Sequence, residues 1–71
     1  MEHQRVSSSC IAEVAYEPST ATLGVRLHEG RSYLYFSVPE HVYRKLLSAD
    51  SIGKCFNNDI RLAGYSYWRL P

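Results

Sequence analysis

The sequence predicts an α+β domain. A three-stranded antiparallel meander is followed by two short α-helices packed on one face, in the order β-β-β-α-α. Apolar residues alternate over short runs within residues 10–36, and Gly and Pro residues punctuate those runs. After Pro39 the apolar spacing becomes helical. With 71 residues the chain makes a single domain, which we expect over residues 8–71 behind a flexible tail of residues 1–7.

The three strands are expected over residues 10–16, 23–27 and 32–36. Pro18 supplies the fixed φ that the first turn requires. The second turn leaves two registers open. A two-residue loop of Glu29 and Gly30 would put two tyrosines of the third strand on the open face of the sheet, as a stacking platform. A three-residue loop that begins at His28 would turn those tyrosines toward the core.

The three-residue loop is favoured because it demands a positive φ of Gly30 alone, whereas the shorter loop demands it of Glu29 as well. In that register Val25 lies opposite Tyr33 and Leu23 lies opposite Tyr35, so both tyrosines belong to the core. The residues predicted for this core are Ile11 or Val14, Leu23, Val25, Tyr33, Tyr35, Val42, Leu46, Phe56 and Ile60.

The first helix is expected to begin at a capping box, with Ser37 as the cap and Glu40 three residues later. Its apolar stripe consists of Val42, Tyr43, Leu46 and Leu47.

The second helix has Asp50 or Ser51 as its cap, and Asn57 or Asn58 can end it. Its apolar stripe consists of Ile52, Cys55, Phe56 and Ile60. The aromatic segment that follows, residues 65–71, is expected to pack on the domain or to add an edge strand.

Charge and chemistry exclude several function classes. Eight Lys and Arg residues against seven Asp and Glu residues argue against a strongly electrostatic nucleic-acid binder. The His and Cys residues have no zinc-ligand spacing, and nothing orients His41 as a base for Cys55. Cys10 and Cys55 are expected as reduced, buried thiols. We therefore expect a protein that is not an enzyme and binds no metal or cofactor. Without an apolar leader or a spanning segment, it is expected in the cytoplasm and not in a membrane.

Short motifs along the chain resemble one family when they are taken in order. They are Ser8-Ser9, Ala15-Tyr16-Glu17-Pro18, Leu23-Gly24-Val25-Arg26-Leu27, Gly30, Tyr33-Leu34-Tyr35, Val38-Pro39, Tyr43, Leu46-Leu47, Gly53-Lys54, Phe56-Asn57, Ile60-Arg61, Tyr65 and Tyr67. Over residues 6–70 the pattern resembles the KTSC domain, a small domain named after the C-terminus of lysyl-tRNA synthetase. The resemblance implies a stand-alone member of that family, and RNA binding by analogy with the synthetase fusion. It also marks Tyr33 and Tyr35 as a family motif with a structural role.

Two functions remain as hypotheses, with RNA and a protein partner undecided. An RNA-binding module would use the polar residues of the two helices, namely Arg44, Lys45, Lys54, Asn57 and Arg61. A protein-interaction module, such as an adaptor, an inhibitor or a homodimer, would use the C-terminal segment, where the candidates are Tyr65, Tyr67, Trp68 and Arg69.

Overall fold

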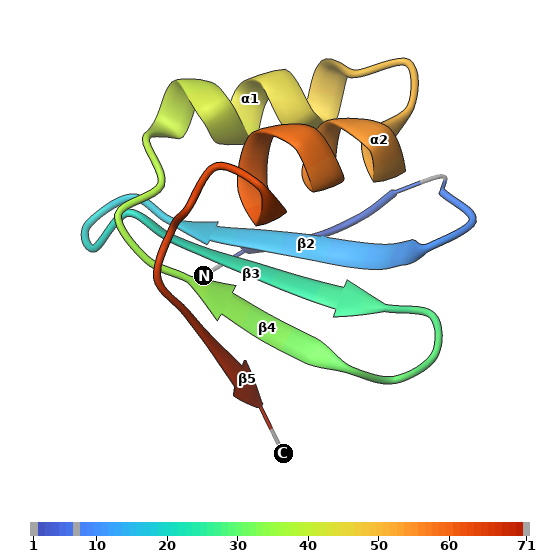
Figure 1. Ribbon diagram of the computed structural model, residues 1–71, viewed down its shortest axis with the longest axis horizontal. Helices are drawn as coiled ribbons and strands as arrows, with labels where there is room; N and C mark the ends of the chain where they lie inside the picture. Colours follow the sequence, from blue (N-terminus) through green and yellow to red (C-terminus); the bar gives the residue numbers. More distant parts are fainter. Residues whose placement is uncertain (1, 7, 71) are drawn as a thin grey trace.

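The computed structural model describes residues 2–6 and 8–70 and confirms the α+β class. Five antiparallel strands form one sheet in the order β1-β2-β3-β4-β5, and the helices cover one of its faces (Figure 1). The strands are β1 (Glu2–Arg5), β2 (Ile11–Glu17), β3 (Thr22–Leu27), β4 (Ser32–Tyr35) and β5 (Tyr67–Leu70). The helices are α1 (Glu40–Ser48), α2 (Ile52–Phe56) and the π-helical turn η1 (Asn57–Arg61).

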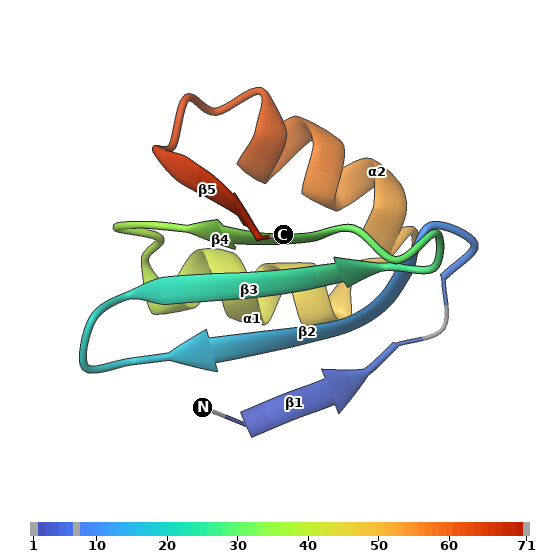
Figure 2. The same ribbon diagram turned by 90° about the horizontal axis from the view of Figure 1, so that it is seen from below.

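The three strands predicted from the sequence understate the sheet, because both of its edges come from the ends of the chain (Figure 2). β1 lies within residues 1–7, which the sequence predicted to be a tail, and β5 realises the edge-strand alternative for the C-terminal segment. The polar sequence Glu2-His3-Gln4-Arg5 carries no apolar alternation. Its strand conformation comes from pairing with β2, a tertiary interaction that the pattern of the segment itself cannot reveal.

The second hairpin has the predicted three-residue loop. The backbone N–H of Leu27 donates to the carbonyl of Arg31 at 2.9 Å, and Gly30 has a φ of 107°. Val25 therefore lies opposite Tyr33, and Leu23 lies opposite Tyr35. Both tyrosines consequently occupy the face of the sheet that carries the helices.

The capping box predicted for α1 is wrong. The N-cap is Pro39, which makes no side-chain cap hydrogen bond, and Ser37 has a φ of 58°. At this left-handed position Ser37 turns the chain from the sheet up to the helix layer, while the N–H of Val38 donates to the carbonyl of Ala21 at 2.9 Å. The tight connection needs Ser37 two residues before the cap, so its side chain cannot serve the helix.

The second helical segment begins as predicted but does not end as predicted. The Ser51 hydroxyl accepts a hydrogen bond from the backbone N–H of Lys54, which confirms it as the N-cap. Asn57 has helical φ and ψ, and α2 continues directly into η1, where the N–H of Leu62 donates to the carbonyl of Asn57. Asn57 and Asn58 therefore lie inside a continuous helical segment and do not terminate it. Such π-turns are often found at functional sites.

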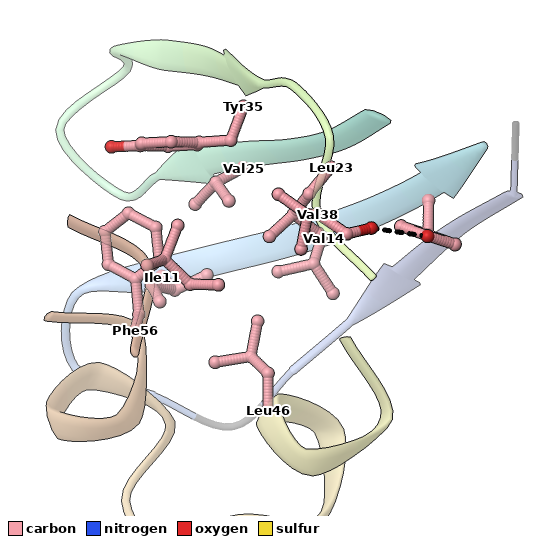
Figure 3. Close-up of a cluster of buried hydrophobic side chains, with 10 residues drawn as sticks. Ile11, Val14, Leu23, Val25, Tyr35, Val38, Leu46 and Phe56 are labelled. Atoms are coloured by element: carbon pink, nitrogen blue, oxygen red, sulfur yellow. Dashed lines mark hydrogen bonds between the residues drawn. The ribbon is translucent and has the colours of Figure 1, made fainter. Parts of the chain in front are cut away.

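The core lies between the sheet and the helices and contains the predicted side chains with two exceptions (Figure 3). Tyr33 and Val42 are only half-buried. Tyr16 and Val38 join the core instead, and the Tyr16 hydroxyl donates to the carbonyl of Val38 at 2.6 Å. The fully buried side chains are Ile11, Val14, Leu23, Val38, Leu46 and Ile60.

The two thiols are free, but the prediction that both are buried is wrong. Cys10 is exposed and Cys55 is half-buried. Cys10 comes immediately before β2, in the connection from β1, where it lies outside the core that Ile11 enters.

Candidate functional site

A cavity of about 790 Å³ opens on the helix side of the sheet, between the β4–β5 end and the second helical segment. Figure 2 shows α2 running along this end of the sheet, while α1 lies behind its middle. The cavity is lined by the connection before β2, the β3–β4 loop, β4, β5, α2 and η1. Its lining residues include Cys10, His28, Arg31, Tyr33, Tyr35, Phe56, Asn57, Arg61 and Tyr67.

Three tyrosines line one wall because the strand register brings them to the same face. Tyr33 and Tyr35 alternate along β4, and Tyr67 of β5 lies opposite Tyr35. The ring centroids of Tyr35 and Tyr67 are 5.5 Å apart, and those of Tyr33 and Tyr67 are 6.0 Å apart. Phe56 of α2 meets Tyr35 edge-on at 5.7 Å. Tyr33, Tyr35 and Tyr67 thus form an aromatic triangle, which packs on the core through Tyr35 and Phe56.

The three tyrosine rings differ in how far they are exposed to solvent. Tyr35 is 4% exposed, Tyr33 is half-buried and Tyr67 is 62% exposed. Burial raises the pKa of Tyr35 above its ordinary value, and the positive charge of Arg61 partly opposes that rise. Aromatic faces that combine burial at one end with exposure at the other provide a stacking surface held rigidly by the sheet.

Two arginines flank the tyrosines. Arg31 pairs with Glu29 in the β3–β4 loop, and that pairing, with a smaller contribution from Tyr33, raises the pKa of the guanidinium. Arg61 lies in the last turn of η1 and has no carboxylate partner among the described residues. Arg61 is therefore the cation of the cavity that is available to an anionic ligand. Asn57 adds an amide that can both donate and accept hydrogen bonds.

The structure divides the residues that the sequence suggested for RNA binding. Asn57 and Arg61 line the cavity. Lys45 pairs with Asp59 at 3.0 Å and Arg44 pairs with Glu40 at 2.5 Å, both on the outer surface of the helices. Lys54 is exposed on α2 and does not line the cavity.

Sequence reasoning missed two cavity residues, His28 and Arg31. The imidazole Nε2 of His28 lies 2.9 Å from the carbonyl oxygen of Ser8, which ties the β3–β4 loop to the connection before β2. Arg31 is two residues before Tyr33, so the Tyr-x-Tyr motif could have drawn attention to it.

The residues suggested for protein interaction do not form one patch. Tyr65 is half-buried and packs against the core. Tyr67 and Arg69 share the helix side of β5, because they lie opposite Tyr35 and Tyr33. Trp68 lies opposite Leu34, so it projects from the open face of the sheet, where it is 63% exposed.

A small polar cluster joins α1 to the second helical segment. The Cys55 thiol donates to Oδ2 of Asp59 at 3.4 Å, and Lys45 Nζ lies 3.0 Å from the same oxygen. Lys45, and then Cys55, lowers the pKa of Asp59. Burial, followed by the neighbouring carboxylate, raises the pKa of Cys55. A thiol held in its protonated form is a poor nucleophile.

The described residues contain no group of three or more His, Cys, Asp or Glu side chains that could hold a metal ion. None of the helices in this part of the chain is long and apolar enough to cross a membrane.

Comparison with known proteins gives consistent matches. The model of the KTSC domain family matches residues 7–65. An uncharacterised protein of Stutzerimonas stutzeri is 36% identical over 70 residues, which cover 99% of each chain. A protein of Tsukamurella paurometabola is 38% identical over 58 residues, covering 82% of this chain and 87% of the other. The crystal structure of the KTSC domain protein YPO2434 from Yersinia pestis superimposes with a TM-score of 0.90 at 30% identity, covering 99% of this chain and 97% of that chain.

Proposed function

The chain belongs to the KTSC domain family, and from that premise we propose that it is a non-enzymatic module that binds single-stranded RNA through the tyrosine cavity. Membership of a family supports a fold and an ancestry, but function has to be argued from the site. The observation that carries the proposal is the aromatic triangle flanked by Arg61, which has no carboxylate partner within residues 2–6 and 8–70.

Base stacking supports the RNA side of the proposal. Tyr67 is 62% exposed, and the centroid of its ring lies 6.0 Å from that of Tyr33. A planar base can therefore stack on the exposed ring of Tyr67. Stacking of one base on an aromatic side chain contributes about 1–3 kcal/mol and tolerates any sequence. At about 790 Å³ the cavity has a volume in the range typical of pockets for small ligands. We therefore assign it one nucleotide of a longer strand.

The cations supply the second contact. Arg61 can bind a phosphate of the same nucleotide as a planar, bidentate donor, and Asn57 can hydrogen-bond the edge of the base. Arg31 contributes less because Glu29 already pairs with it. The formal net charge of the chain is only +1, which supports few phosphate contacts and a modest affinity.

The small number of cations at the cavity sets the salt dependence expected for RNA binding. For single strands, the logarithm of the affinity falls with the logarithm of the salt concentration by about 0.7 per neutralised phosphate. One or two contacts through Arg61 and Arg31 predict a slope between about −0.7 and −1.4. A broad basic surface would give a much steeper slope.

Low nucleophilicity of the thiol supports a non-enzymatic role. The half-buried Cys55 has a raised pKa and donates its proton to Asp59. Its environment therefore opposes formation of the thiolate on which cysteine catalysis depends.

The test is a titration of the isotopically labelled protein with a short unstructured RNA at several salt concentrations, followed by amide NMR. We expect shifts around Tyr33, Asn57, Arg61 and Tyr67. Arg61→Gln should weaken binding at least fivefold and make the salt slope shallower by about 0.7. Lys54→Gln is the matched control, because it removes a cation of the same segment outside the cavity. Shifts confined to α1, or equal losses in both variants, would contradict the cavity as the binding site.

One observation favours protein interaction as a second candidate. Trp68 is 63% exposed on the open face, and Trp is enriched among residues that dominate protein interfaces. If the protein is a protein-interaction module, RNA should leave the amide NMR signals of the cavity residues unshifted. Trp68→Ala should then remove binding of the protein partner without changing the fold.

A further inference from the structure

The two edges of the sheet differ in how they are protected. β1 ends one side with Glu2-His3-Gln4-Arg5, whose described side chains are exposed and polar. β5 ends the other side with Tyr67-Trp68-Arg69-Leu70, in which Tyr67 and Trp68 are 62% and 63% exposed. Proteins usually blunt an open edge with charged side chains, because an unprotected edge pairs with other strands. β1 follows this rule with two charged residues, whereas β5 has Arg69 as its one charged residue beside two exposed aromatic rings.

The hydrogen bonds to β4 determine which backbone groups of β5 remain open. The N–H of Phe36 donates to the carbonyl of Ser66 at 2.9 Å, which makes these two residues a hydrogen-bonded pair. In an antiparallel ladder such pairs alternate with non-hydrogen-bonded ones. Trp68, opposite Leu34, therefore directs its backbone groups toward β4. Tyr67 and Arg69 direct theirs away from the sheet.

We propose that β5 pairs with β5 of a second copy of this chain, in antiparallel register, with the two-fold axis at Trp68. Tyr67 of each copy then lies opposite Arg69 of the other, and these are the residues whose N–H and C=O groups point outward. Each pair exchanges both of its backbone hydrogen bonds. The two Trp68 residues meet as a non-hydrogen-bonded pair, the kind whose side chains approach most closely. The ten strands of the two chains form one continuous sheet.

Side-chain chemistry agrees with this register. On the helix side, the Arg69 guanidinium of one copy lies against the Tyr67 ring of the other, a favourable cation–π arrangement. On the open face, the two exposed indoles cover one another. An axis at Arg69 would instead set two guanidinium groups face to face. An axis at Tyr67 would require residues 65 and 66 to continue β5, which begins only at Tyr67 after the left-handed Gly64.

The pairing also extends the cavity, because Tyr67 lines it. Arg69 of the second copy arrives beside Tyr67 and adds a cation at the mouth. The dimer does not depend on RNA binding and forms from the free protein. Since only four residues per chain make the contact, we expect it to be reversible and dependent on concentration.

Sedimentation velocity of the full chain over a wide concentration range tests the backbone contact. Arg69→Pro removes the side chain and the outward N–H, whereas Arg69→Ala removes the side chain alone. Neither change touches a hydrogen bond to β4, and an edge strand tolerates proline where its N–H faces outward. We expect the dimer of the Arg69→Pro variant to have a dissociation constant at least tenfold higher than that of the Arg69→Ala variant. Equal dissociation of the two variants, or a wild-type chain that stays monomeric at every concentration, would overturn the proposal.

Disulfide trapping tests the register. In a background of Cys10→Ser and Cys55→Ser, Trp68→Cys places two thiols across the two-fold axis, and the expected Cα separation of a non-hydrogen-bonded pair, about 4.5 Å, suits a disulfide. We expect mild oxidation to give a covalent dimer of Trp68→Cys at least tenfold faster than of Arg69→Cys, whose counterpart lies opposite Tyr67. Faster trapping at position 69, or none at either position, would overturn the register with its axis at Trp68.

Discussion

Two tyrosine clusters lie on the same face of one sheet and behave in opposite ways. Tyr16 of β2 stacks on Tyr43 of α1, with centroids 4.8 Å apart and planes 12° apart. Its hydroxyl donates to the carbonyl of Val38 at 2.6 Å. Tyr33, Tyr35 and Tyr67 at the other end of the sheet are tilted or edge-on to one another and open progressively to solvent.

The difference comes from the helix that covers each end. α1 lies behind the middle of the sheet (Figure 2). Its Tyr43 stacks on Tyr16 of β2 and seals this end of the tyrosine face from solvent, and the Tyr16 hydroxyl has a fixed internal acceptor. The second helical segment runs along the β4–β5 end and leaves a cavity above it. The same residue type therefore stabilises the fold at Tyr16, where the ring and its hydroxyl are buried, and opens to solvent at the cavity, where we propose that it binds RNA.

Replacing one ring in each cluster should give the largest contrast. Tyr16→Ala removes a ring that is 7% exposed and should lower the free energy of unfolding by about 3–5 kcal/mol, the cost typical of deleting a buried aromatic side chain. Tyr67→Ala should lower it by less than about 1 kcal/mol and instead weaken RNA binding by about 1–3 kcal/mol. Urea unfolding and the RNA titration measure both quantities. Similar destabilisation by the two changes would make the cavity cluster part of the core.

Removing single hydroxyls sharpens the comparison. Tyr16→Phe keeps the stacked ring but leaves the buried Val38 carbonyl without its donor, so we expect a loss of about 1–3 kcal/mol in unfolding free energy. Tyr33→Phe should change stability by no more than about 0.5 kcal/mol, because that ring is half-buried at the cavity. Urea midpoints of the two variants decide this, and a larger loss in Tyr33→Phe would refute the assignment of roles.

The tyrosine face was predictable from the sequence, whereas the cavity was not. Glutamate resists the positive φ that the shorter loop requires, and this local rule placed Tyr33 and Tyr35 on the helix side correctly. The cavity depends on how far the second helical segment covers the sheet, which is a tertiary property. No local pattern marked His28 as a cavity residue, and the signal for Arg31 was its position two residues before Tyr33.

The corrected elements share one cause. β1 has no apolar alternation and becomes a strand only through β2. Ser37 has the sequence context of a cap, but the path from β4 up to α1 takes it to a φ of 58° and out of reach of the helix. In both places tertiary structure overrides the local preference of the sequence. At β1 the pairing with β2 decides the conformation, and at Ser37 the chain reversal outweighs a cap that would contribute about 1 kcal/mol.

Alkaline titration can distinguish the two clusters, because different charged neighbours shift the pKa values of their tyrosines. The pKa of Tyr16 is raised by burial and then by Glu40, and the pKa of Tyr35 is raised by burial while Arg61 opposes the rise. A tyrosine whose folded pKa is raised contributes stability that is fully present below its unfolded pKa of about 10 and is lost as the pH rises through the folded pKa. Arg61→Gln should therefore delay ionisation of Tyr35 and leave Tyr16 unchanged.

Tyrosinate absorbance measures this, with Tyr35→Phe and Tyr16→Phe identifying the two late components. A delay that persists when Arg61→Gln is combined with Tyr35→Phe would show that Arg61 acts on another ring.

The smallest effect is expected at the Lys45–Asp59 contact, which ties α1, over the sealed end, to η1, over the cavity. Hydrogen bonding by Lys45 is the main cause that lowers the pKa of Asp59. This carboxylate contributes stability that is present above its unfolded pKa of about 3.9 and is lost as the pH falls through the folded pKa. Lys45→Gln should raise the pKa of Asp59, so acid unfolding should begin at a slightly higher pH.

NMR titration of the Asp59 carboxyl group checks this change, with Arg44→Gln as the control cation on the same helix. An Asp59 midpoint that Lys45→Gln leaves unmoved would mean that Asp59 does not hold Lys45. Lys45 would then be available to a phosphate on the outer surface of α1. The contrast between the two ends of the sheet would lose its functional meaning, because an RNA strand could bind over the sealed end as well as over the open one.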